Sequence, residues 1–96
     1  MGEIRIYYDA LAEYIRRMGG HLYVDKNRVV DVYLPVVVEE VPGGVQYHLI
    51  GKLEDDVVVV KACIVMYQDE IHEVDPSELA GWANYVNSLH RGEEKK

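Results

Sequence analysis

The sequence lacks phenylalanine, has a single cysteine and has only three prolines among its 96 residues. The one cysteine, Cys63, excludes an intramolecular disulfide and a multi-cysteine zinc site, and it fits a reducing compartment. The sequence also lacks a signal peptide and any apolar run long enough to cross a bilayer. We therefore expect a cytoplasmic protein that does not associate with membranes.

Positive charge is scarce, since 10 Lys and Arg face 17 Asp and Glu, and most of the net charge of -7 lies in residues 29–78. Such a field repels phosphate backbones, so we expect no nucleic-acid partner. No twelve-residue calcium loop and no zinc-site histidine spacing accompanies the carboxylates, and we expect no metal and no cofactor. We interpret the following acidic residues as solvated loops: Glu39, Glu40, Asp69, Glu70, Glu73 and Asp75.

What is present is typical of one small globular domain, because 49% of the residues are hydrophobic and 28% are charged. We assign residues 1–92 to a single α+β domain and residues 93–96 to a disordered tail. Eight tyrosines without phenylalanine, together with abundant valine, resemble the composition of thermophilic proteins.

The first eighteen residues fit two patterns. Apolar residues at helical spacing are Ile4, Tyr8, Leu11, Ile15 and Met18. Strand-like alternation covers only residues 3–8. The longer match predicts a helix that ends at Gly19 and Gly20, with Glu13 four residues before Arg17. The alternative keeps residues 3–8 as a strand and begins the helix after Asp9.

Four strands are predicted after the glycines, at residues 21–25, 29–41, 45–53 and 57–67, because turn-forming residues separate these apolar segments. Consecutive strands with short turns form an antiparallel meander. The segment from Asp75 to Glu78 then combines a helix cap, a proline and an acidic first turn, which predicts a C-terminal helix. The predicted fold is α+β: an N-terminal helix, a four-stranded antiparallel meander and a C-terminal helix.

The register of each hairpin follows from keeping apolar side chains on one face. A three-residue loop at 26–28 pairs Leu22 with Val32. A turn centred on residues 42 and 43 pairs Val36 with Leu49. Pro35 then lies beyond the short first strand, where the second strand has an unpaired edge that suits another chain.

The last hairpin sets the faces of the most apolar strand. A turn at residues 55 and 56 pairs Leu49 with Ala62 and His48 with Cys63. In this register Ala62, together with Ile64 and Met66, faces the helices.

The segment 57–67 is apolar on both faces of a strand, which is unusual for so short a chain. Its own helices cover one face only, so a second copy, a protein partner or a ligand is expected on the other. The candidate interface or ligand face comprises His21, Tyr23, Tyr33, His48, Ile50, Lys52, Val59, Lys61, Cys63, Val65 and Tyr67.

One grouping has nucleophilic potential, because His48 opposite Cys63, with Lys61 nearby, would favour a thiolate. No oxyanion loop or acidic orienting group accompanies it, and a strand cysteine is more often a small buried hydrophobe. We therefore expect a small non-enzymatic homodimeric binding or adaptor protein that uses one sheet face for self-association or partner binding. The alternative is a small-ligand-binding protein or enzyme with a pocket around His48, Lys61 and Cys63.

Overall fold

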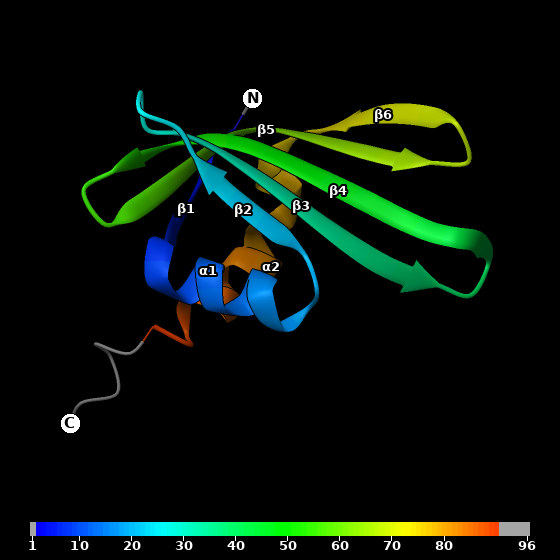
Figure 1. Cartoon of the computed structure of the whole chain (residues 1–96), viewed down its shortest axis with the longest axis horizontal. Helices are drawn as coiled ribbons and strands as arrows, with labels where there is room; N and C mark the ends of the chain where they lie inside the picture. The colour runs from blue at the N-terminus through cyan, green and yellow to red at the C-terminus, as the bar shows by residue number, and fades with distance from the viewer. Residues whose placement is uncertain (1, 91–96) are drawn as a thin grey trace.

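The computed structural model describes residues 2–90 and has two layers, an antiparallel six-stranded sheet with two helices on one face (Figure 1). The α+β class is confirmed, but the sheet has six strands where four were predicted. In chain order the elements are β1 (Ile4–Tyr7), α1 (Tyr8–Arg17), β2 (His21–Val24), β3 (Val29–Val38), β4 (Val41–Glu54), β5 (Val57–Tyr67), β6 (Glu70–Val74), the 3-10 turn η1 (Pro76–Leu79) and α2 (Ala80–Asn87). The strand order is β1-β5-β4-β3-β2, and β6 also pairs with β5.

The predicted helix over the first eighteen residues is wrong at its start, because residues 4–7 form β1. Ile4 pairs with Val60 and Ile6 with Val58. Both isoleucines are buried against the sheet while Arg5 between them is exposed. Burial on one face of a strand outweighs the helical spacing here, and the alternative of a short strand followed by a helix is nearer to the structure.

The strand β6 was not predicted. It folds back along β5 through Gln68 and Asp69, which have φ values of 51° and 68°. Two left-handed residues are typical of a tight hairpin turn, but Gln-Asp lacks the glycine that usually marks it. Four of the five β6 residues are exposed, so the strand shows no apolar alternation from which it could be inferred.

The predicted register of β2 with β3 is confirmed, whereas that of β3 with β4 is wrong. Leu22 pairs with Val32 as predicted. Val36, however, pairs with Val45 rather than Leu49, because the chain turns at residues 39 and 40 instead of at the Pro-Gly pair. The shift of four residues is even, so every side chain of β4 keeps its predicted face.

A bulge in β5 changes its faces. The turn at residues 55 and 56 is confirmed, but Ile50 pairs with Ala62 while Gly51 pairs with Val60, which leaves Lys61 unpaired. Glycine is required at position 51, since a Cβ there would lie 2.3 Å from the carbonyl oxygen of Val59. One extra residue turns the rest of the strand over, so the predicted facing of Ala62, Ile64 and Met66 toward the helices is wrong.

The core lies between the sheet and the helices and contains Ile6, Leu11, Ile15, Val32 and Leu49 among its fully buried side chains. Asp75 caps the C-terminal helical segment as predicted, accepting a hydrogen bond from the Ser77 N–H at 3.0 Å, although the segment opens with a 3-10 turn. Among residues 2–90, no helix has the length and apolarity needed to cross a membrane. The predicted tail at 93–96 lies outside the described residues.

The hairpins β3–β4 and β5–β6 project past the helices at the right of Figure 1. We call this part, residues 35–46 and 65–73, the wing. It accounts for the elongated outline of 43 × 28 × 24 Å. Its tips carry the two most exposed large apolar side chains, Val37 at 93% and Ile71 at 70%.

Candidate functional site

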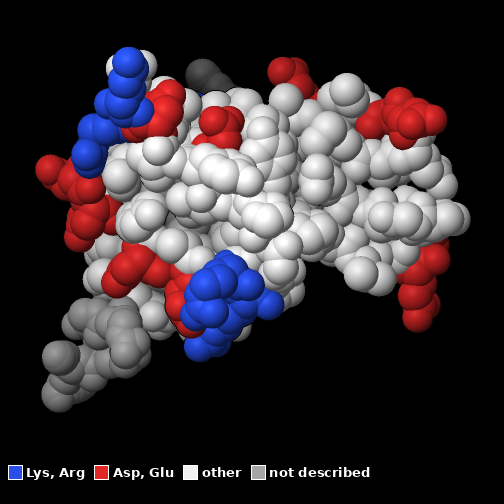
Figure 2. Space-filling view, viewed as in Figure 1, with Lys and Arg blue, Asp and Glu red and all other residues white. Residues whose placement is uncertain are grey.

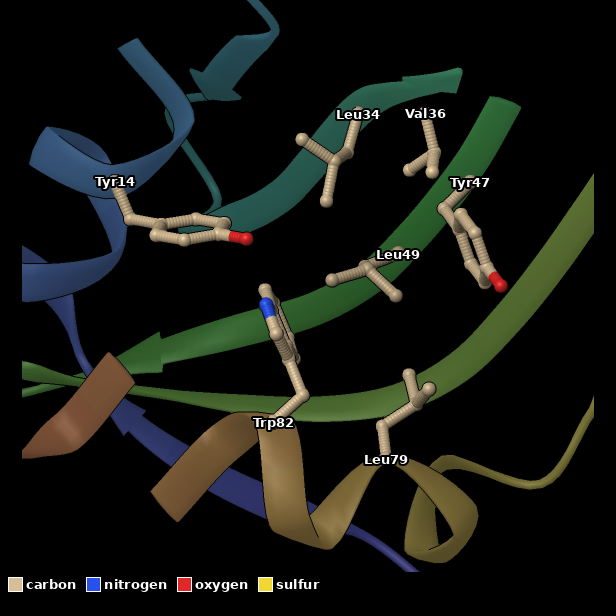
Figure 3. Close-up of a pocket in the computed structure, with 7 residues that line it drawn as sticks. All are labelled: Tyr14, Leu34, Val36, Tyr47, Leu49, Leu79 and Trp82. Atoms are coloured by element: carbon tan, nitrogen blue, oxygen red, sulfur yellow. The ribbon is translucent and has the colours of Figure 1, made fainter. Parts of the chain in front are cut away.

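A pocket of about 230 Å³ opens between the two layers where the wing leaves the helices. Figure 3 shows Tyr14 of α1 and Trp82 of α2 pointing toward Leu34 and Leu49 of the strands. The pocket exists because the helices end before the sheet does, so the apolar face of the strands continues into the open. Its lining consists of Tyr14, Leu34, Val36, Tyr47, Leu49, Leu79 and Trp82.

The pocket is apolar with a few polar tips. No charged side chain lines it. Tyr14 and Trp82 meet edge to face with their ring centroids 5.7 Å apart, and together with Tyr47 they bring two phenol hydroxyls and one indole N–H. A mainly apolar lining with few polar groups is the usual character of a small-molecule site. Such a lining accommodates neutral ligands and disfavours charged ones.

The sheet face opposite the helices carries a row of aromatic and imidazole rings. Tyr33 stacks on His48 with centroids 4.3 Å apart, and Tyr23 meets Tyr33 edge to face at 6.1 Å. His21 stacks beside Tyr23 at 6.2 Å. The ring of His48 is held by Asp31, whose Oδ1 lies 3.0 Å from Nε2. Cross-strand pairing of β2, β3 and β4 aligns these side chains.

Several of the predicted face residues lie together with this row. Lys52 is exposed, Ile50 is half-buried and Val59 is only 1% exposed. Lys61 sits at the bulge and is exposed. The predicted facing of β5 therefore holds before the bulge, but Val59 is already buried within a single chain.

Three predicted face residues lie on the opposite side. Cys63, Val65 and Tyr67 follow the bulge and pack with the core under the helices. Cys63 pairs with Leu49 rather than with His48 and is 1% exposed. Burial raises the pKa of its thiol, which disfavours the thiolate. His48 and Cys63 face opposite sides of the sheet, so the predicted pocket around His48, Lys61 and Cys63 does not form.

The acidic loops do not converge. Within residues 2–90, no three His, Cys, Asp or Glu side chains are arranged to hold a metal ion. Glu70 instead contacts His72 at 3.0 Å on the exposed strand β6. Figure 2 shows acidic groups spread around the ends of the molecule, with a broad uncharged surface between them.

None of the pocket residues was predicted from the sequence to line a site. Trp82 and Leu79 pack against the core from the C-terminal helical segment, and Tyr47 packs against it from β4. The usable signal was the kind of residue, since Tyr and Trp combine a large apolar ring with a polar tip and are enriched where one end of the side chain is apolar and the other is wet.

Comparison with protein-family models, with curated proteins and with solved structures found no match for this chain.

Proposed function

We propose that the protein is a small non-enzymatic homodimeric binding protein that holds a neutral apolar group in the pocket between helices and sheet. The observation that carries the proposal is the pocket lining, in which all seven side chains are apolar or aromatic. A ligand that enters gains from burial at roughly 25 cal/mol per Å² of apolar surface. The hydroxyl of Tyr14 and the indole N–H of Trp82 would orient a ligand that has a polar atom.

The same lining favours binding over catalysis. General acid–base chemistry needs a group that titrates near the working pH, and nucleophilic catalysis needs an activated side chain. The pocket holds neither a carboxylate, a histidine, a lysine nor a cysteine. The buried Cys63 and the net charge of -7 support a cytoplasmic protein whose partners do not include nucleic acid.

The row of rings on the opposite sheet face supports a second contact surface, for a protein partner. Tyr23 is 57% exposed at the edge of that row, beside His21 and Tyr33. Tyrosine buries a large ring while its hydroxyl stays hydrogen-bonded, which suits protein interfaces.

Ligand binding is tested with a pair of probes that share an aromatic skeleton and differ in charge. N-phenyl-1-naphthylamine is neutral, whereas 8-anilinonaphthalene-1-sulfonate carries a sulfonate. Trp82 is the only tryptophan, so quenching of its emission reports on binding, and a variant with a filled pocket then assigns the binding to this site. We expect the neutral probe to quench Trp82 saturably and to bind at least about tenfold more tightly, because the pocket offers no cation to the sulfonate.

A filled pocket provides the control. Val36→Phe should occupy the cavity and weaken binding of the neutral probe by about tenfold, since the probe loses room and contact area. Val45→Phe makes the same change on the same sheet face outside the pocket and should leave binding unaltered. Equal binding by both variants, or no quenching of Trp82 in the parent protein, would refute the pocket as the ligand site.

A further inference from the structure

Part of β3 has an open backbone edge. Pairing with β2 ends at His21 and Tyr33, whereas β3 continues to Val38 and pairs there with β4 alone. The Asp25 N–H donates to the Val29 carbonyl, so alternation turns the peptide groups of odd-numbered β3 residues toward the β2 side. Those of Pro35 and Val37, which lie beyond the last pair with β2, therefore face the edge, and Pro35 offers only its carbonyl. We call residues 34–38 the open edge.

The other edges of the sheet are protected. Along β1 the side chain of Asn87 takes the place of a neighbouring strand: the Tyr7 N–H donates to its Oδ1 at 2.9 Å, and its Nδ2 donates to the Arg5 carbonyl at 3.0 Å. β6 exposes Glu70 and Glu73, and β2 has only four residues. Charged side chains and short strands are the usual means of blocking an edge. Within the open edge only Pro35 hinders the addition of another strand, and Val37 near its end is exposed.

Opposite charges flank the open edge. At one end Gly20 approaches β3 so closely that a Cβ would lie 2.3 Å from the Tyr33 carbonyl oxygen, which brings the end of α1 to this point. Arg16 and Arg17 of that helix share a single carboxylate, Glu13, at 2.7 and 3.1 Å. At the other end the turn carries two exposed glutamates at residues 39 and 40, which have no ion pair among the described residues.

Figure 2 shows a group of basic side chains at the lower middle of this view and a group of acidic side chains at its lower right tip. The surface between the two groups is uncharged in this view. In a two-fold symmetric contact, one end of a strand lies beside the other end of the same strand in the second copy. A two-fold axis through the open edge would therefore place the acidic end of each copy beside the basic end of the other.

We propose that a second copy of this chain pairs antiparallel with the open edge, with the two-fold axis near Val37, so that Glu39 and Glu40 of each copy meet Arg16 and Arg17 of the other. Pairing of Tyr33 with β2 prevents the added strand from reaching past Leu34, and the match of opposite charges selects the register. With Val37 on the axis, residue 40 stands opposite residue 34, beside the end of α1. The two sheets then form one continuous sheet with both helical layers on the same side.

This inference specifies the surface of the homodimer in the proposed function and does not depend on ligand binding. It is tested by charge exchange, with mass measured by light scattering across a dilution series. The parent protein should show twice the chain mass of 11.0 kDa. Glu39→Lys/Glu40→Lys and Arg16→Glu/Arg17→Glu should each raise the dimer Kd by at least about tenfold, because like charges would then meet. Combining the four substitutions should restore the parent Kd.

Matched controls separate the edge from general effects. Glu54→Lys/Asp56→Lys makes the same change of charge at the β4–β5 turn, away from the open edge, and should leave the Kd unchanged. Val37→Lys should block pairing, whereas Ile71→Lys, also highly exposed, should not.

The outcomes are distinguishable. A dimer that tolerates both charge reversals would overturn the edge and leave the homodimer standing. A parent protein that stays monomeric at all concentrations would overturn both, and binding of the neutral probe would be judged separately.

Discussion

Cys63 shows how burial decides the chemistry of a single side chain. Its thiol is 1% exposed, lies in the core beside Leu49 and has a pKa raised by burial. A reactive cysteine needs the thiolate and an approach for its electrophile. Both conditions fail here, so Cys63 is a packing residue.

We predict that iodoacetamide labels Cys63 of the folded protein slowly at neutral pH. The expected rate is at least about a hundredfold below that of the protein unfolded in guanidinium, where the thiol is exposed and its pKa returns to about 8.5. Mass spectrometry over a time course measures both rates. Rapid modification under folding conditions would show that the site opens or that the thiol is activated.

At the scale of the strand, the bulge at Lys61 decides which side chains of β5 enter the core. Before it Val58 and Val60 face the helices, and after it Cys63 and Val65 do. If Lys61 instead took a paired position in the ladder, Cys63 and Val65 would point to the opposite face.

Deleting Lys61 should therefore leave Cys63 and Val65 in the core, because Val60 and Ala62 already pair with the adjacent residues Gly51 and Ile50. The free energy of unfolding should fall by less than about 1 kcal/mol. Lys61→Ala keeps the bulge and should change stability by less than about 0.5 kcal/mol. Urea unfolding followed by Trp82 fluorescence measures both variants. A loss of several kcal/mol on deletion would mean that the extra residue at position 61 does not account for the faces of β5.

Elements were predictable where local signals agreed with burial. The β2–β3 and β4–β5 turns and the Asp75 cap follow from residue type and apolar alternation. The bulge at Lys61 depends on a close backbone approach at Gly51, which the apolar run hides because both of its faces suit a core. The turn at residues 39 and 40 forms in preference to the stronger Pro-Gly signal nearby. The pocket depends on where the helices stop relative to the sheet, a relation between distant elements that no local pattern records.

At the scale of the whole molecule, the negative net charge bears on binding to nucleic acids. The rings of Tyr23 and Tyr33 on the sheet are of the kind that stack with bases. The protein, however, has a net charge of -7, which repels the phosphates of a nucleic acid. Electrostatic attraction supplies most non-specific affinity for nucleic acids, and a net charge of -7 opposes it.

We predict that fluorescence anisotropy detects no binding of a labelled oligothymidylate at physiological salt. The comparison is a basic protein of similar size under the same conditions, which should bind it. Saturable binding by this chain would show that stacking on the ring row outweighs repulsion by the acidic surface.

The side chain of Asn87 has a consequence for the order in which the molecule is made. β1 precedes the other strands of this sheet along the chain, but its neighbour in the sheet lies at residues 57–60 and the amide that closes its outer edge comes only at residue 87. β1 must therefore stay unpaired until residues 57–60 have left the ribosome, and its outer edge stays open until Asn87 has followed. A polypeptide that stops short of Asn87 would keep that edge open and would be prone to join its neighbours on the polysome.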